Sequence, residues 1–493
     1  MKTIAVIGAG LGGLSAAARL ARAGFEVHVF EKNTFAGGKA SELYEQGFRF
    51  DTGPSLLTMP YVLENLFEEC NENISDYLSM NKLEIICRYF YNDNTIINAY
   101  SDVQRFGEEI SEKSVDDDEA LNDFFNYSKT IYELTADLFL FNPPLNYKTF
   151  LNTKALRTLF NINKIDSFRT VHKAVSSYFK DKKLVQLFDR YATYNGSNPF
   201  KAPATLNIIP YVEYFPGAFL PEGGIYSITK ALVKLCENAG VHFHYNSEVE
   251  QILLNNKNAM GLKVNGDSIF FDKIISNTDV NLTFQKLLNG INTSESKRYR
   301  KLKPSLSGVV FYWAINRKYE MLETHNIIFS ENYKKEFYEL TKLNVIPDEP
   351  TIYIYISSKI NPNDAPADKE NWFVMINAPY DNGQDWEKEI AGVRKRVINK
   401  INNRLGIKIE DDLLFERIMT PKILDLKTAA YRGSIYGISS DSKTSAFLRQ
   451  QNKSKCIKNL YFCGGSAHPG GGIPLVILSG KIVSDIIKDE YQK

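Results

Sequence analysis

The chain opens with Ile4-Ala5-Val6-Ile7-Gly8-Ala9-Gly10-Leu11-Gly12-Gly13, a short apolar segment that runs directly into a glycine-rich turn. Residues 14–23 follow with a helical pattern that ends at Gly24, and residues 26–31 form a second strand-like segment that ends in Glu31. Strand, Gly-x-Gly-x-x-Gly turn, helix, strand and acid, in this order, are typical of a dinucleotide-binding βαβ unit. We therefore predict a Rossmann-like nucleotide-binding layer that begins here.

Each glycine of this turn has a physical role. Gly8 allows the tight turn, Gly10 lets a pyrophosphate approach the backbone, and Gly13 lets the helix pack closely on the strand. The free amides and the positive dipole at the helix start attract the phosphates. Glu31 can accept hydrogen bonds from a ribose, and its charge repels a 2′-phosphate, which disfavours NADP. An ordinary glycine turn is the alternative, but it does not account for the flanking strands and the acid.

Length and composition indicate a globular protein with more than one domain. The chain has 493 residues, of which 44 % are hydrophobic and 24 % charged. A net charge of +1 gives no reason to expect nucleic acid as a partner. Aromatic residues make up 13 % of the chain, which indicates either large cores or contact with an apolar ligand or a membrane surface.

The cysteines and the hydropathy bear on the environment of the chain. Five cysteines are few, odd in number and unclustered, so we expect a reducing compartment, no disulfide framework and no metal site. No stretch reaches the roughly 18 uncharged apolar residues of a spanning helix. The first strand begins at the N-terminus without a signal peptide before it, and we therefore expect a cytoplasmic protein.

Further turns suit a bound ligand. Residues 37–39 read Gly-Gly-Lys, and residues 48–55 read Phe-Arg-Phe-Asp-Thr-Gly-Pro-Ser, a strand followed by a turn. Glycine beside proline, with small hydroxyls, suits a backbone that lies against a flat ligand, and a surface turn is the alternative. A similar Pro-Glu-Gly-Gly turn at residues 221–224 precedes a predicted helix over 225–239.

The middle of the chain differs in pattern from its ends. Helical periodicity dominates from about residue 59 to residue 200. Long apolar strands are predicted at 309–315, 351–356 and 372–377. Residues 273–277 are predicted to return to the nucleotide-binding sheet, so that layer is expected to be assembled from separate segments.

A possible membrane contact lies in the helical region. Residues 138–145 read Leu-Phe-Leu-Phe-Asn-Pro-Pro-Leu, which is too short to span a bilayer. Residues 148–190 then hold ten lysines and arginines against three aspartates, a local charge of +7. Aromatic residues beside a basic stretch fit a surface that rests on anionic lipid. The alternative is a helical lobe with a solvated charged face.

The C-terminal end supplies a second glycine loop. Residues 468–474 read His-Pro-Gly-Gly-Gly-Ile-Pro, after a predicted strand and turn at 460–466 and before a helix that runs to residue 489. Three glycines, with Pro474 near the first helical position, leave free amides at a helix start. Such amides suit the edge of a flavin that gains negative charge on reduction. No strand and acid follow this loop, so we expect one nucleotide and no pyridine-nucleotide site.

Together these motifs resemble those of bacterial phytoene-desaturase-type carotenoid desaturases, which are FAD enzymes of the amine-oxidase-like superfamily. The resemblance runs from end to end, and the loop at 464–474 is its specific part. Within the family the chain looks most similar to flavobacterial 3,4-desaturases that act on 1-hydroxylated carotenoids.

The resemblance implies an α/β plus α+β architecture. A Rossmann-like FAD-binding domain would comprise residues 1–75, 222–290 and 422–493. An inserted substrate-binding and membrane-associating domain of mixed sheet and helices would comprise residues 76–221 and 291–421.

The resemblance also implies which residues contact FAD. They are Gly8, Gly10, Leu11, Gly12, Gly13, Glu31, Lys32, Gly38, Lys39, Gly53, Pro54, Ser55, Val249, Gly464, Gly465, Gly471, Gly472 and Ile473.

The reaction implied is the FAD-dependent removal of hydride from an allylic carbon of a C40 polyene, which creates a conjugated double bond. The expected position is C3–C4 of a 1-hydroxylated carotenoid. A polyene offers no acidic C–H and no handle for a nucleophile, so the protein contributes alignment and dry packing. Glu213 and His468 are candidates for the proton acceptor, and the alternatives are a lobe carboxylate and a turn residue packed near the flavin.

The expected partners are a hydrophobic carotenoid, the inner membrane surface, and a quinone or oxygen as electron acceptor. Alternative functions are phytoene desaturase, another flavin oxidoreductase of the superfamily such as a carotenoid isomerase or amine oxidase, and a non-enzymatic prenyl-binding escort protein. The sequence predicts no oligomeric state.

Overall fold

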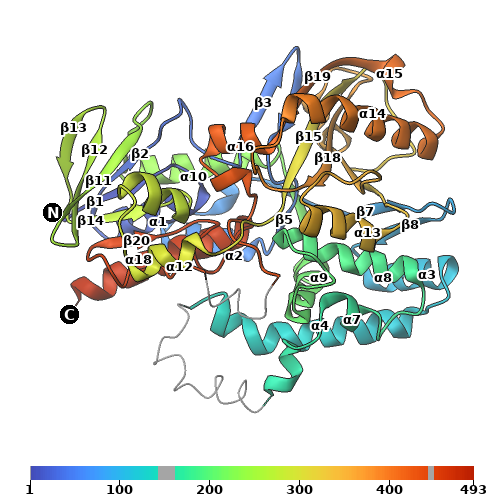
Figure 1. The fold of residues 1–493 in the computed structure, drawn as a ribbon, viewed down its shortest axis with the longest axis horizontal. Coiled ribbons are helices and arrows are strands. Elements are labelled where there is room, and N and C mark those ends of the chain that lie inside the picture. The colour runs from blue at the N-terminus through green and yellow to red at the C-terminus, as the bar shows by residue number, and fades with distance from the viewer. Residues whose placement is uncertain (1, 143–160, 442–448, 493) are drawn as a thin grey trace.

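The structure is a computed structural model that describes residues 2–142, 161–441 and 449–492 (Figure 1). A five-stranded parallel sheet forms its nucleotide-binding layer. In spatial order the strands are β10 (His242–His244), β2 (Glu26–Phe30), β1 (Thr3–Ile7), β14 (Lys273–Ser276) and β20 (Leu460–Phe462). Strands from three distant parts of the chain therefore meet in one sheet, and the predicted return of residues 273–277 is confirmed.

Helices from both ends and from the middle of the chain cover this sheet. They are α1 (Leu11–Arg22), α2 (Tyr61–Glu69), α10 (Tyr226–Asn238) and α18 (Ile473–Tyr491). The Oγ of Ser15 donates to the carbonyl of Ile477 at 2.7 Å. A Cβ at Gly480 would lie only 2.5 Å from the carbonyl oxygen of Gly12. Helices α1 and α18 therefore pack in close contact. This contact brings together the two glycine loops, each of which precedes one of these helices.

A second, seven-stranded sheet carries the other half of the molecule. In spatial order its strands are β19 (Leu413–Met419), β15 (Ser307–Ile315), β18 (Glu370–Ala378), β17 (Ile352–Ile356), β16 (His325–Ile328), β7 (Ile85–Phe90) and β8 (Ile96–Tyr100). All neighbouring pairs are antiparallel except β16 and β7. The two segments that we assigned to the inserted domain thus share one sheet.

The two faces of this sheet have different partners, because side chains alternate along a strand. On β15, Phe311 and Trp313 pack in one apolar cluster with residues of α14 (Trp386–Leu405), while Val310 and Tyr312 belong to the cluster on the other face. Figure 1 shows α14 over the outer face. The inner face is therefore free to form a wall toward the nucleotide-binding layer.

Further helices complete the structure. A lobe at the lower right of Figure 1 consists of α3 (Val103–Lys113), α4 (Asp118–Phe139), α7 (Val171–Val175), α8 (Lys182–Asp189) and α9 (Ile208–Tyr214). The remaining short helices are α11 (Val280–Leu282), α12 (Ser294–Arg300), α13 (Tyr333–Tyr338), α15 (Ile409–Asp412) and α16 (Pro421–Thr428). Among the described residues, no helix combines the length and the apolar character needed to cross a bilayer.

The described residues also form three small sheets. Their strands are β11 (Val249–Asn255), β12 (Asn258–Val264) and β13 (Asp267–Phe270); β3 (Glu42–Glu45) and β4 (Phe48–Asp51); and β5 (Leu57–Thr58), β9 (Ala218–Pro221) and β6 (Met80–Lys82). Val264 pairs with Asp267, so β12 and β13 form a hairpin with a tight turn at residues 265–266.

Candidate functional site

The nucleotide-binding layer and the inner face of the second sheet enclose a cavity of about 530 Å³. Its wall includes the glycine turn after β1, the C-terminal glycine loop, and side chains of the seven-stranded sheet. Of the residues predicted to contact the cofactor, all except Gly13 line this cavity. A Cβ at Gly13 would lie 2.5 Å from the carbonyl oxygen of Gly8, so Gly13 allows the helix to approach the strand. This is the packing role predicted for the third glycine.

The start of α1 is built to receive an anion. Gly8 adopts a φ of +93°, which favours glycine, and its N–H donates to the carbonyl of Phe30 at 2.8 Å. Gly10 is the N-cap of α1 and has no side chain to cap the helix. The amides of the first turn and the helix dipole are thus offered to a ligand in the cavity.

Glu31 lies at the end of β2, beside this turn. Its Oε2 accepts a hydrogen bond from the amide of Ala9 at 2.9 Å, and its Oε1 accepts from the amide of Asn33 at 3.0 Å. The carboxylate is buried and lines the cavity, with lone pairs left for further donors. This geometry fits a carboxylate that binds a ribose and braces the glycine turn at the same time.

Asn277 is a residue of the site that the sequence reasoning missed. It follows β14, and its Nδ2 donates to the carbonyl of Gly8 at 3.0 Å. A Cβ at Gly464 would lie 2.6 Å from Asn277 Oδ1, and a Cβ at Gly10 would lie 2.9 Å from its Nδ2. Asn277 therefore joins the N-terminal and C-terminal glycine turns. A polar residue at the end of a strand that returns to the sheet was the available signal.

Lys39 brings a partly buried cation to the cavity wall. Its Nζ donates to the carbonyls of Ser434 and Ile435 at 2.9 and 2.6 Å. Burial lowers the pKa of Lys39 to about 8, against the opposing charges of Asp279 and Asp425. Burial likewise raises the pKa of Asp279, which also lines the cavity, to about 6. Both pKa values lie closer to pH 7 than usual, so the protonation of Lys39 and Asp279 can respond to a charged ligand.

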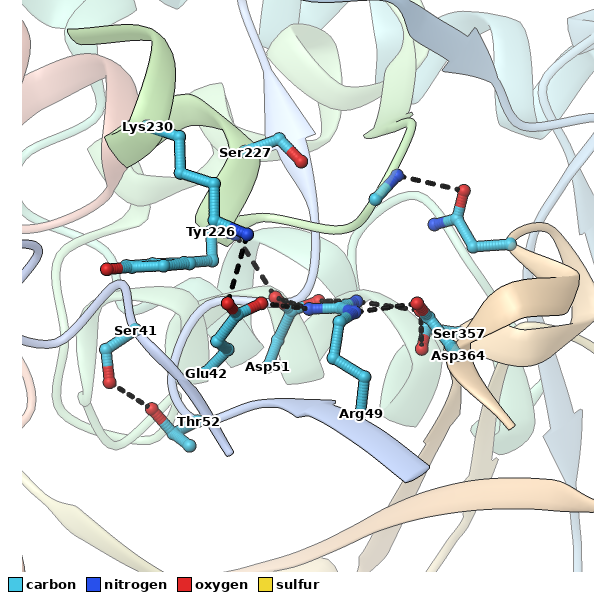
Figure 2. A network of polar contacts seen from close by, with 12 residues as sticks. Ser41, Glu42, Arg49, Asp51, Thr52, Tyr226, Ser227, Lys230, Ser357 and Asp364 are labelled. Carbon is cyan, nitrogen blue, oxygen red and sulfur yellow. Dashed lines mark hydrogen bonds and ion pairs between the residues drawn. The ribbon is translucent and has the colours of Figure 1, made fainter. Parts of the chain in front are cut away.

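A cluster of ion pairs directly precedes the turn at residues 52–55. Figure 2 shows Arg49 between two carboxylates: its Nη1 donates to Asp51 Oδ1 at 2.9 Å, and its Nε donates to Asp364 Oδ1 at 2.6 Å. A Cβ at Gly224 would lie 1.9 Å from Arg49 Nη2, so the Pro-Glu-Gly-Gly turn packs directly on this guanidinium. Burial opposes the charge of Arg49, but its hydrogen bonds to Asp364 and Asp51 outweigh burial and raise its pKa. The cluster ties β4 to the second sheet.

The C-terminal loop ends at the start of α18. Gly472 is the N-cap of α18 with a φ of +111°, and Pro474 lies in its first turn. A Cβ at Gly471 would lie 2.8 Å from Cδ1 of Tyr436. Glycine at 471 thus lets the loop backbone pass against Tyr436 and face the cavity, as the helix-start argument requires.

The opposite wall of the cavity is apolar. Its hydrophobic side chains are Ile86, Leu306, Val310, Ile327, Phe373, Met375 and Met419. Polar groups interrupt this wall at a few positions only, among them Arg190, His325, Tyr333 and Tyr353. The cavity therefore joins an anion-binding, glycine-lined half to a half suited to a long apolar ligand.

Neither candidate proton acceptor lies on the cavity wall as the described residues define it. Glu213 is fully buried and accepts hydrogen bonds from the hydroxyls of Tyr191 and Tyr194 at 2.7 and 2.6 Å. His468 is buried, with Nε2 3.0 Å from the carbonyl oxygen of Asn142. Burial lowers the pKa of His468 to about 4. These positions favour structural roles for both residues.

The structure describes the suspected membrane contact in part. Residues 143–160, with the cations Lys148, Lys154 and Arg157, lie outside the described residues. Phe141 is half-buried against the main core, and Arg190 is buried in the cavity wall, so neither belongs to an exposed face. Phe168, by contrast, is 74 % exposed on the same basic segment.

One group of potential metal ligands lies outside the cavity. At the edge of the five-stranded sheet, Glu26, His28 and His242 bring ligand atoms within 4.8 Å of one another, a grouping that the sequence reasoning did not anticipate. His28 Nδ1 lies 3.0 Å from His244 Nε2, and the His28 and His242 rings stack with centroids 4.7 Å apart. The rings are engaged with one another, and we assign no metal to them.

Comparison with known families identifies the family of this chain. Residues 11–488 match the family described as flavin containing amine oxidoreductase. The chain belongs to this family. It is an FAD-dependent oxidoreductase, and FAD fits the site on structural grounds, because the uncapped start of α1, the carboxylate of Glu31 and the bare loop at α18 all face one cavity.

Similar proteins cover the whole chain. It is 39 % identical to a 1-hydroxycarotenoid 3,4-desaturase from a Flavobacterium species, over 99 % of both chains. It is 34 % identical to a 4,4′-diapolycopene oxygenase from a Methylomonas species, over 99 % of this chain and 98 % of the relative. Among solved structures, an oxidoreductase from Methanosarcina mazei is similar with a TM-score of 0.63 at 18 % identity, covering 98 % of this chain and all of that one. A variant of putrescine oxidase has a TM-score of 0.66 at 12 % identity over 99 % of both chains, and both likenesses concern the fold alone.

Proposed function

We propose that this protein is a carotenoid desaturase that introduces a conjugated double bond into a C40 polyene, at C3–C4 of a 1-hydroxylated carotenoid. The observation that carries the proposal is the cavity, in which a dinucleotide-binding half opens onto an apolar sheet face. The desaturase relative, 39 % identical over nearly the full length of both chains, supports the same substrate class.

The residues of the cavity have definable tasks in such a reaction. When bound, FAD supplies the acceptor for the hydride that leaves the allylic carbon. The apolar wall, with Val310, Phe373 and Met375, aligns the polyene and excludes water. The amides at the start of α18 stabilise negative charge by about 1 kcal/mol for each favourable contact. The partly buried cation Lys39 lines the same cavity and adds positive charge to it.

We propose that the chain forms two domains, with the FAD-binding domain in residues 1–75, 222–290 and 422–493 and the inserted domain in residues 76–221 and 291–421. The five-stranded sheet and its covering helices fall within these segments, and the seven-stranded sheet falls within residues 76–221 and 291–421. The predicted FAD contacts other than Gly13 are likewise proposed, supported by their position on the cavity wall.

We propose a quinone or oxygen as the electron acceptor, because one dinucleotide-binding fingerprint leaves no second site for NAD or NADP. Anaerobic turnover that NAD⁺ alone sustains would contradict this assignment. We also propose a cytoplasmic location at the inner membrane surface, where a lipid-soluble substrate is available. The exposed Phe168, with the exposed cations Lys164, Arg169 and Lys173 near it, supports such a contact.

Pigment analysis after co-expression tests the reaction. The gene is expressed in cells that make a 1-hydroxylated carotenoid and, separately, in cells that make phytoene. We expect the hydroxylated pigment to lose two hydrogens and to absorb at longer wavelength. A product that gains oxygen would favour the oxygenase chemistry named for the relatives at 32 and 34 % identity. Conversion of phytoene alone would move the assignment to an early desaturase.

A further inference from the structure

Three buried polar atoms, each in a residue that lines the cavity, have no hydrogen-bond partner among the residues that the structure describes. They are His325 Nε2, Arg190 Nε and Tyr333 Oη. All three residues line the cavity, and their exposed fractions are 3 %, 7 % and 7 %. Buried polar groups in folded proteins are nearly always paired, because an unpaired one loses its hydrogen bonds to water without compensation. Unpaired groups gathered on an apolar cavity wall therefore point to a ligand that satisfies them.

His325 is held in place by groups that lead back to the cofactor turn. Its Nδ1 lies 2.7 Å from the hydroxyl of Tyr353, and that hydroxyl lies 2.6 Å from the Oγ of Ser55. The His325 ring also stacks on Tyr355, with ring centroids 5.0 Å apart. Ser55 belongs to the turn that we assign to the flavin. Two hydrogen bonds thus link His325, through Tyr353, to the turn assigned to the flavin.

Arg190 contributes a donor whose charge is already balanced. Its Nη2 donates to the hydroxyl of Tyr89 at 2.6 Å, and its Nη1 donates to that of Tyr194 at 3.3 Å. Tyr194 in turn donates to Glu213 at 2.6 Å, so the carboxylate balances the guanidinium through a tyrosine bridge. A second carboxylate from a ligand is not needed for charge balance, and a neutral oxygen is the better partner for Arg190 Nε.

The protonation of His325 fits a neutral ligand as well. Burial first, and then the nearby charge of Arg190, together lower the pKa of His325 to about 3. The ring is therefore neutral at physiological pH, and Nε2 either donates or accepts, depending on the tautomer. A hydroxyl group can accept from Arg190 Nε and also exchange a hydrogen bond with His325 or Tyr333. A hydrocarbon end can do neither.

We propose that Arg190, His325 and Tyr333 bind the hydroxyl of an oxygenated end group and so select hydroxylated polyenes over their hydrocarbon parents. This inference rests on the proposed function and adds to it the specificity-determining residues. The link from His325 to Ser55 sets the hydroxyl close to the flavin turn. The bond that is oxidised is then only a few carbons from the hydroxyl, as C3–C4 is from a hydroxyl on C1.

The test compares kcat/KM for a 1-hydroxylated acyclic C40 carotenoid and for the same carotenoid without the hydroxyl, using the FAD-loaded protein. We expect the wild type to favour the hydroxylated substrate by about 10²-fold or more, because sites built around a hydroxyl reject analogues that lack it. Tyr333→Phe and His325→Leu should each lower this ratio by about tenfold or more, mainly through the hydroxylated substrate. Ile327→Val, which alters the same strand β16 and the same wall without a polar group, should leave the ratio unchanged.

Loss of folding is not expected to account for the changed substrate ratio. The Tyr333 hydroxyl has no partner among the described residues, so Tyr333→Phe should keep the thermal midpoint of the wild type. If the wild type turns over both substrates equally, or if Tyr333→Phe and His325→Leu both keep the wild-type ratio, the inference is overturned while the desaturase proposal stands. If neither substrate is converted, the proposed function and the inference both fail.

Discussion

Replacement of Gly224 by alanine should damage the protein far more than its backbone conformation alone would suggest. Gly224 has a φ of +79°, and a Cβ there would lie 1.9 Å from Nη2 and 2.5 Å from Cζ of Arg49. Gly240 has nearly the same φ, +84°, but a Cβ there would meet nothing within 4 Å. The pair therefore separates the cost of the backbone conformation from the cost of displacing Arg49.

The magnitude follows from the ion cluster in Figure 2. A side chain at positive φ costs about 1–2 kcal/mol at either position. At Gly224 the methyl group must also push Arg49 away from Asp51 and Asp364, and all three side chains are at most 9 % exposed. Breaking a buried ion pair costs about 3–5 kcal/mol, because it leaves charges without partners. We expect Gly224→Ala to lose about 3–5 kcal/mol more than Gly240→Ala.

Urea unfolding followed by tryptophan fluorescence is a suitable assay. The protein's tryptophans, Trp313, Trp372 and Trp386, lie in the second sheet and in α14, so they report on the half of the molecule that contains Asp364. Equal loss of stability in the two variants would refute the reasoning, because it would mean that Arg49 moves aside without cost.

Three further outcomes are expected. Glu31→Ala should weaken FAD retention about tenfold or more, measured as flavin lost on dialysis. The control Glu26→Ala, at the other end of β2, should retain FAD. Equal retention by the two variants would remove Glu31 from the site. Burial lowers the pKa of His468 from 6.5 to about 4. The stability that the neutral ring contributes is therefore present above pH 6.5 and is lost as the pH falls toward 4. The free energy of unfolding should decrease by up to about 3 kcal/mol over this range. His468→Asn should flatten this part of the pH profile in thermal unfolding, and an unchanged slope would count against it. Phe168→Ser should reduce sedimentation with anionic vesicles at low salt. The control Phe270→Ser, on the exposed hairpin strand β13 at the left of Figure 1, should leave sedimentation unchanged. Wild-type protein that stays in the supernatant would refute the membrane contact.

The parts of the site formed by local sequence could be predicted from the residues. The turn from Gly8 to Gly13 and the acid at Glu31 form a contiguous unit whose physics is local, and the structure has the expected strand, helix and strand there. The loop before Pro474 was readable for the same reason, since glycines and a proline at a helix start have a direct conformational meaning.

The parts that depend on tertiary packing could not be predicted. Asn277 is one polar residue after one strand, and its role appears only when β14 and β20 lie side by side. Arg49 and Asp364 are 315 positions apart, and nothing in either local pattern pairs them. His325 begins the short strand β16, and nothing in the local sequence marks it as part of a site. Its unpaired Nε2 becomes meaningful only beside the cavity.

An anaerobic single-turnover experiment addresses the proposed reaction itself. The purified FAD-loaded protein is mixed, without oxygen or quinone, with a 1-hydroxylated carotenoid in vesicles, and the flavin absorbance and the pigment mass are followed together. We predict that the visible flavin absorbance bleaches as an equimolar amount of pigment loses two hydrogens and gains one conjugated double bond. Loss of hydrogen from the pigment without flavin bleaching, or an unchanged pigment with fully loaded flavin, would contradict FAD-dependent desaturation.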